Sequence, residues 1–171
     1  GRSSPSGAVI VRCITPRAPL IAASEALATA DISGARMPMM VGTSAGAMEL
    51  GEDYFKQAMS SPTRRAGQFM RAETYQPQRQ MCWMAEALQV DGPIRIVSNA
   101  CASGANAIGH AFHMVRSGRA ERVLAGGFDA LCQLVFCGFD SLQALSPTGI
   151  PRPFDADRDG LALGEGAGFM V

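Results

Sequence analysis

Residues 94–104 read Ile94-Arg95-Ile96-Val97-Ser98-Asn99-Ala100-Cys101-Ala102-Ser103-Gly104. The first four favour a buried β-strand, because three of them are β-branched. After residue 101 the apolar spacing changes to that of one helix face, made of Ile108, Ala111, Phe112 and Val115. A buried strand that leads through small residues into a buried helix is typical of layered α/β domains.

Helix-like and strand-like segments alternate on both sides of this stretch. Helices are predicted over residues 17–30, 49–59, 78–90 and 131–139. Strands are predicted over residues 8–14, 37–41 and 122–127, with a last apolar run at 161–171. Residues 1–16 are otherwise uninformative, so we expect one α/β domain over residues 17–171. Because the chain stops within an apolar run, we expect it to be a fragment.

The composition excludes several classes of protein. The chain has 171 residues, 47% of them hydrophobic, with 15 basic and 15 acidic side chains. This balance gives no electrostatic reason for binding nucleic acid or an anionic membrane. No secretory signal is recognisable, and the longest uncharged run, 96–115, holds too many polar residues for a bilayer span. The five cysteines lack zinc-site spacing and are expected to be reduced thiols of a cytoplasmic protein.

Cys101 is the first candidate for a functional residue. It lies between the predicted strand and the predicted helix, where free N–H groups and the helix dipole favour a thiolate. Its small neighbours leave room for a substrate to approach. The alternative is a buried, inert cysteine, and position alone leaves both open.

Ser44 is a second candidate, in Gly42-Thr43-Ser44-Ala45-Gly46. The pattern matches the nucleophile elbow of serine hydrolases. However, no Gly-rich oxyanion loop precedes Met37, so a tight turn that needs small residues is the favoured interpretation.

Three further motifs do not predict a ligand site. Residues 155–160 begin like a calcium loop, but Gly166 stands where the bidentate Glu should be, so we expect a loop held by its own carboxylate hydrogen bonds. The Gly-rich run 164–168 precedes a strand rather than a helix, which argues against a dinucleotide site. His110 and His113 are too few for zinc and too far along the helix to serve Cys101 as a base. No metal and no cofactor are expected.

Several motifs taken together carry a family resemblance. In order and spacing the chain resembles the N-terminal half of the β-ketoacyl-acyl carrier protein synthases at residues 98–104, 125–127, 144–147, 152–155, 158–160 and 164–168. The resemblance is strong over residues 94–171, weaker over 17–90, and absent before Arg17. It implies a thiolase-like fold, in which two similar α/β halves with mixed, largely buried sheets form a five-layered α/β/α/β/α sandwich, usually as a homodimer. The early strand of this fold is expected to be missing or rewritten in residues 1–16.

The resemblance also implies a chemistry. Cys101 would accept an acyl chain from an acyl carrier protein thioester, and a decarboxylated malonyl unit would then attack it to give a 3-ketoacyl product in fatty acid or polyketide synthesis. The backbone N–H of Cys101 would be one oxyanion donor. Ala45 and Phe139 match positions that line the family's acyl pocket, and a small Ala45 would leave space for a longer chain. The family's catalytic histidines, lysine and second oxyanion donor lie in a C-terminal half that this chain lacks.

Two alternatives to this function stay open. One is a thiolase-type condensation without decarboxylation. The other is a non-catalytic half that acts only with a partner subunit.

Overall fold

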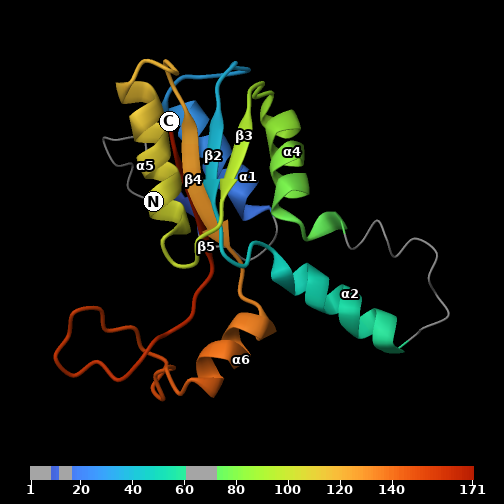
Figure 1. Ribbon diagram of the computed structural model, residues 1–171, viewed down its shortest axis with the longest axis vertical. Helices are drawn as coiled ribbons and strands as arrows, with labels where there is room; N and C mark the ends of the chain where they lie inside the picture. The colour runs from blue at the N-terminus through green and yellow to red at the C-terminus, as the bar shows by residue number, and fades with distance from the viewer. Residues whose placement is uncertain (1–8, 12–16, 61–72) are drawn as a thin grey trace.

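The computed structural model describes residues 9–11, 17–60 and 73–171 (Figure 1). Its helices are α1 (Ala18–Thr29), α2 (Met48–Ser60), α4 (Pro77–Leu88), α5 (Ser103–Arg116) and α6 (Gln133–Ser141). Its strands are β1 (Val9–Val11), β2 (Met39–Gly42), β3 (Ile94–Val97), β4 (Leu124–Asp129) and β5 (Gly166–Met170). The predicted segments therefore form, most of them with ends within about two residues of the prediction.

The strands make one mixed sheet in the order β1-β5-β4-β2-β3. Strand β2 lies parallel to both β3 and β4, whereas β5 runs antiparallel to β4 and β1. The predicted mixed α/β sheet is thus confirmed. Of the two expectations for the early strand, that it is missing or rewritten, the first is excluded, because residues 9–11 pair with residues 167–169 at the sheet edge. The other residues of the strand predicted at 8–14 lie outside the described residues.

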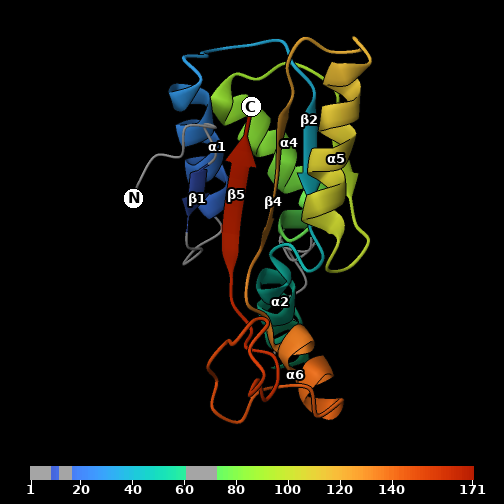
Figure 2. The same ribbon diagram turned by 90° about the vertical axis from the view of Figure 1, so that its left-hand side faces the viewer.

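Helices cover both faces of the sheet. Helices α1 and α4 pack on one face and α5 on the other, and Figure 2 shows α1 and α5 on opposite sides. Side chains of β2 alternate accordingly: Met39 and Val41 enter the core under α1 and α4, and Met40 enters the core under α5. The result is a three-layer α/β/α arrangement, which corresponds to one half of the predicted sandwich.

The predicted buried face of α5 is partly wrong. Ala107 and Ala111 are buried, but Phe112 is 57% exposed and Val115 is 45% exposed. Small residues face the sheet because the helix lies so close to it: a Cβ on Gly42 would lie 2.3 Å from the carbonyl carbon of Ser103. Only a face of small side chains fits such a short separation, so the large apolar residues lie to the side.

The parallel strands place their carboxyl ends at one edge of the sheet. Strands β2, β3 and β4 all end near the bottom of Figure 1, where α2 and α6 extend away from the sheet. The turn 43–46 follows β2, residues 98–102 follow β3, and Asp129 ends β4. Loops at this edge are the usual place for ligand sites in α/β folds.

Candidate functional site

Cys101 lies at the junction that the sequence predicts. Strand β3 ends at Val97, Ala102 is the N-cap residue, and α5 begins at Ser103. The Cys101 side chain is exposed in this chain, as the nucleophile interpretation requires. An accessible sulfur beside the free N–H groups of a helix N-terminus has the surroundings of a nucleophile.

The turn that holds Cys101 has an unusual backbone. Ala100 adopts φ +57°, in the left-handed region that L-residues other than Gly rarely occupy. Its carbonyl oxygen accepts three hydrogen bonds: from the Ser103 N–H (3.0 Å), the Ser103 hydroxyl (2.6 Å) and the Ser44 hydroxyl (2.7 Å). The Ser103 hydroxyl in turn accepts the Asn99 N–H at 2.9 Å. These bonds offset a strain of about 1–3 kcal/mol.

Asp129 fixes the neighbouring turn. Its carboxylate Oδ1 accepts hydrogen bonds from the backbone N–H groups of Ser44 (2.9 Å), Ala45 (2.7 Å) and Gly46 (2.7 Å). The Thr43 hydroxyl adds a fourth at 2.8 Å. Residues 43–46 therefore wrap around one carboxylate, as in the small-residue turn favoured from the sequence. Asp129 is not among the residues predicted from the sequence, where its one signal is an acidic residue at the end of a buried strand.

Ser44 is not arranged as a hydrolase nucleophile. Its hydroxyl donates to the Ala100 carbonyl, not to a general base. Both histidines of the chain lie on α5 with exposed side chains. The ring of His113 packs edge-on against the ring of Phe112, with 5.7 Å between the two ring centroids. The Ser44 hydroxyl thus connects the turn 43–46 to the turn of Cys101, and Ala45 lies in the first of these turns, next to Ser44.

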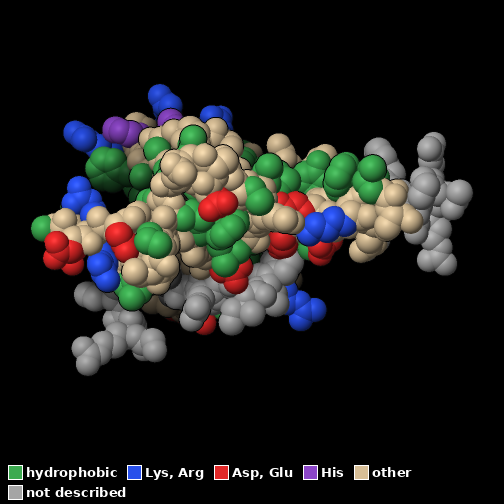
Figure 3. All heavy atoms as spheres, turned by 90° about the horizontal axis from the view of Figure 1, so that it is seen from below, with side chains coloured by type: hydrophobic (Ala, Val, Ile, Leu, Met, Phe, Trp, Pro, Cys, Tyr) green, Lys and Arg blue, Asp and Glu red, His purple; other side chains and the backbone are tan. Residues whose placement is uncertain are grey.

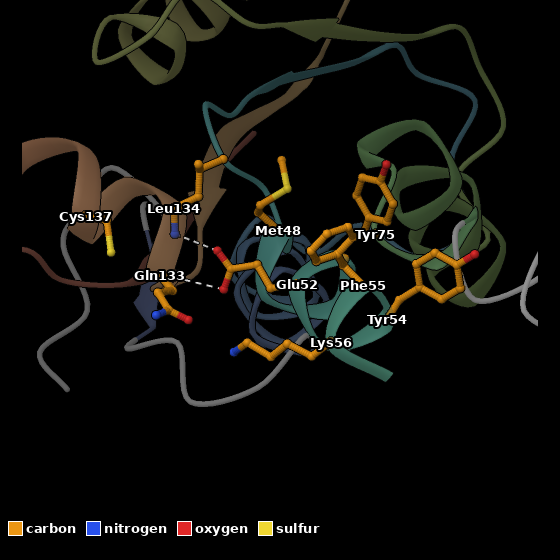
Figure 4. Close-up of a pocket in the computed structure, with 10 residues that line it drawn as sticks. Met48, Glu52, Tyr54, Phe55, Lys56, Tyr75, Gln133, Leu134 and Cys137 are labelled. Carbon is orange, nitrogen blue, oxygen red and sulfur yellow. Dashed lines mark hydrogen bonds between the residues drawn. The ribbon is translucent and has the colours of Figure 1, made fainter. Parts of the chain in front are cut away.

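A pocket lies at the same edge, between α2 and α6. It has a volume of about 630 Å³. Figure 4 shows Tyr54, Phe55 and Tyr75 on one side and residues of α6 on the other. The Glu52 carboxylate crosses toward α6 and accepts the N–H groups of Gln133 (3.0 Å) and Leu134 (2.6 Å). Neither Cys101 nor Ala45 lines this pocket, and the half-buried Phe139 of α6 is not among its lining residues either.

Carboxylates gather around the N-terminus of α6. Glu165 accepts the Leu131 N–H at 3.2 Å, close to the Glu52 contacts. Burial raises the pKa of Glu49, and the charges of Glu165, Glu52 and Asp53 raise it further against an opposing backbone hydrogen bond. Seen from below, Figure 3 shows several acidic side chains near the middle of this face. Within the described residues, no group of three or more metal-ligating side chains has the arrangement of an ion site.

The loop between α6 and β5 is held by its own carboxylates, as predicted. Asp159 accepts hydrogen bonds from the hydroxyls of Ser146 (2.6 Å) and Thr148 (3.0 Å), which lower the pKa of Asp159. Asp155 accepts the Asp157 N–H at 2.9 Å. Within the predicted loop 155–160, the Asp155 bond is the expected local carboxylate hydrogen bond, whereas Asp159 connects the loop to residues 146 and 148.

Among the helices that the structure describes, none combines the length and the apolar character that a membrane span requires.

Comparisons with known proteins agree with this geometry. The family model described as "Beta-ketoacyl synthase, N-terminal domain" matches residues 15–171. A putative polyketide beta-ketoacyl synthase 1 of Streptomyces cyaneus is 33% identical in an alignment of 168 positions that covers 89% of this chain and 40% of the relative. A 3-oxoacyl-[acyl-carrier-protein] synthase 2 of Synechocystis sp. is 32% identical over 82% of this chain and 35% of the relative. The chain therefore spans about 40% or less of these curated relatives.

A solved structure shares the fold. The structure titled "The ishigamide ketosynthase/chain length factor" superposes with a TM-score of 0.74 at 29% identity, over 94% of this chain and 42% of that one. The predicted thiolase-like fold, of which this chain is one α/β half, is confirmed.

Proposed function

Because the chain belongs to the β-ketoacyl synthase N-terminal domain family, we propose that Cys101 is the acyl-accepting nucleophile of a decarboxylative condensing enzyme. The Cys101 thiolate attacks the carbonyl carbon of an acyl thioester, the new S–C bond forms, and the carrier thiol leaves with a proton. A malonyl thioester then loses CO₂, and its carbanion attacks the acyl group on Cys101. A carbon–carbon bond forms, the bond to Cys101 breaks, and a 3-ketoacyl thioester results.

One observation carries this proposal: an exposed thiol at the N-terminus of α5, held in a turn fixed by hydrogen bonds. The N–H of Cys101 is the oxyanion donor that this chain would supply. Neither His110 nor His113 contacts the site, so we assign the decarboxylation step to residues of the whole protein beyond the part that this chain matches in its relatives.

Carrier protein, partner and location follow from the same proposal. The relatives include a 3-oxoacyl-[acyl-carrier-protein] synthase and a polyketide synthase component, which supports an acyl carrier protein substrate in fatty acid or polyketide synthesis. We propose a homodimer; the ketosynthase/chain length factor neighbour makes a heterodimer the alternative. The free thiols of the four described cysteines support a cytoplasmic location.

Ala45 and Phe139 are proposed to line the acyl pocket. Ala45 has direct support, because the turn it occupies is hydrogen-bonded to the turn of Cys101. Phe139 lies on α6, and its support is the family resemblance alone. A Phe in place of Ala45 should shorten the acyl chains that the enzyme accepts, and an unchanged product profile would count against this role.

The test uses the whole protein with acyl- and malonyl-carrier protein. Cys101→Ala should abolish both the covalent acyl-enzyme and the 3-ketoacyl product, whereas Cys82→Ala, which removes another exposed thiol on α4, should retain them. Product formed by Cys101→Ala would overturn the proposal. If the wild type formed the 3-ketoacyl product when the malonyl thioester was replaced by a second acyl thioester, with no CO₂ released, the thiolase-type alternative would be favoured. No acylation of the wild type would favour the non-catalytic half.

A further inference from the structure

We propose that Ser44 is a positioning residue for the reaction at Cys101, an inference that rests on the proposed function. The Ser44 hydroxyl donates to the Ala100 carbonyl at 2.7 Å, and Ala100 immediately precedes the nucleophile. Ser44 itself would contact no reacting atom. It would act through the backbone, by holding the turn in the conformation that presents the Cys101 sulfur at the start of α5.

The turn needs such a restraint. Ala100 has φ +57°, and the left-handed conformation of an Ala is less stable than an extended or helical one. If Ala100 relaxed to a common conformation, the peptide plane between residues 100 and 101 would rotate. The Cys101 N–H and the direction of its side chain would rotate with it. Hydrogen bonds to the Ala100 carbonyl oppose that rotation directly.

Two hydroxyls hold this carbonyl, and they differ in what they connect. Ser103 is 3% exposed and donates from within the same turn, three residues away. Ser44 donates from a position 56 residues earlier in the chain, in the turn that follows β2. Of these two hydroxyls, that of Ser44 is the one that connects the turn of Cys101 to the turn after β2. The anchor is rigid, because the Asp129 carboxylate holds the backbone N–H groups of residues 44–46.

The side chain of Ser44 is separable from the turn that carries it. The turn 43–46 is built by backbone N–H groups and by the Thr43 hydroxyl, all directed at Asp129. The Ser44 hydroxyl takes no part in those bonds, and the residue is exposed. Its removal should therefore leave the turn and the core intact and loosen only the Ala100 carbonyl.

The expected effect is moderate. A single neutral hydrogen bond has a small net free energy, so its loss should slow acylation of Cys101 by about three- to tenfold. Since the Ser44 hydroxyl is directed at the Ala100 carbonyl and not at the substrate, KM for the acyl thioester should stay unchanged while the acylation rate constant falls.

The experiment measures single-turnover acylation of the whole protein by an acyl thioester, with intact-mass detection, alongside the thermal unfolding midpoint. Variants are Ser44→Ala, Ser44→Thr, which keeps the hydroxyl, Ser117→Ala and Cys101→Ala. Ser117 is the matched control, because its hydroxyl also donates to a backbone carbonyl, that of Met114, but at the far end of α5. Ser44→Ala alone among the serine variants should slow acylation, at unchanged KM and unchanged unfolding midpoint.

Three results would overturn the role of Ser44. They are an unchanged acylation rate in Ser44→Ala, a loss in Ser44→Thr equal to that in Ser44→Ala, or a lowered unfolding midpoint with normal acylation of the folded protein. Failure of the proposed function itself is a separate outcome, because it would appear as acylation that persists in Cys101→Ala.

Discussion

Cys101 and Cys132 show how the environment of a residue sets its chemistry. Cys101 is exposed before α5, whereas Cys132 is 6% exposed before α6. Burial raises the pKa of the Cys132 thiol, and the nearby charges of Glu52, Glu49 and Asp129 raise it further, against the Val135 hydrogen bond that lowers it. Both cysteines lie next to a helix N-terminus, so position relative to a helix alone does not make a thiol reactive.

We therefore predict an order of labelling by limiting iodoacetamide near neutral pH. Cys101 should react first, because it is accessible and lies beside free N–H groups. Cys132 should react last of the four described cysteines, since it is buried and its raised pKa leaves less thiolate. Peptide mass spectrometry of partially labelled protein measures the order, with urea-unfolded protein as the control. Equal rates at Cys101 and Cys132 in the folded protein would contradict the prediction.

At the scale of single residues, the sequence indicated the proposed nucleophile but not the residues that hold its turn. Cys101 could be singled out because the sequence predicts a strand before it and a helix after it. Ala100 and Asp129 could not be singled out in this way. Nothing about an Ala residue in a sequence predicts that its backbone is left-handed. The bonds from Asp129 to residues 43–46 also span more than 80 positions, and local patterns cannot report them.

At the scale of elements, one close approach controls where α5 lies. A Cβ on Gly42 would lie 2.3 Å from backbone atoms of Ser103, so the end of β2 and the start of α5 are in backbone contact. Large side chains cannot enter that interface. This explains why strand 94–97 was predicted correctly while the buried face of α5 was not: helix periodicity locates an apolar stripe, but the distance to the sheet decides which side of it is buried.

Two Gly→Ala substitutions test this contact. Gly42→Ala should destabilise the protein by about 1–3 kcal/mol or more, because backbone atoms must move to admit the methyl group. It should also slow acylation, since the N-terminus of α5 carries Cys101. Gly109→Ala is the matched control within α5, where a Cβ would meet nothing within 4 Å. That change should stabilise the helix by up to about 1 kcal/mol. Chemical denaturation measures both effects, and equal effects would refute the contact.

At the scale of the whole molecule, the sheet edge with the candidate site also holds a partly buried carboxylate close to other negative charges. The strands and helices above it form a compact apolar core, but Glu49 lies partly buried near three other carboxylates. Its Oε2 atom is shielded from solvent and has no hydrogen-bond partner among the described residues. Such an arrangement lowers the stability of the fold whenever Glu49 is ionised.

The pH dependence of unfolding follows from that raised pKa. The folded protein holds the Glu49 proton to a higher pH than the unfolded chain does, so its stability falls as pH rises through this window. Glu49→Gln removes the charge and should raise the free energy of unfolding at pH 7 by up to about 1 kcal/mol, reduced by solvent screening of a partly buried group. The gain should shrink as the pH falls through the raised pKa of Glu49 toward 4.5, the ordinary value for Glu, and should be gone below it, because the wild-type carboxyl is then protonated in both the folded and the unfolded state. Denaturant titrations at several pH values measure it, with Glu25→Gln on the exposed face of α1 as the control. A Glu49→Gln protein less stable than wild type at pH 7 would show that the surroundings stabilise this carboxylate instead. A gain that does not change with pH would show that the effect does not come from the charge of Glu49.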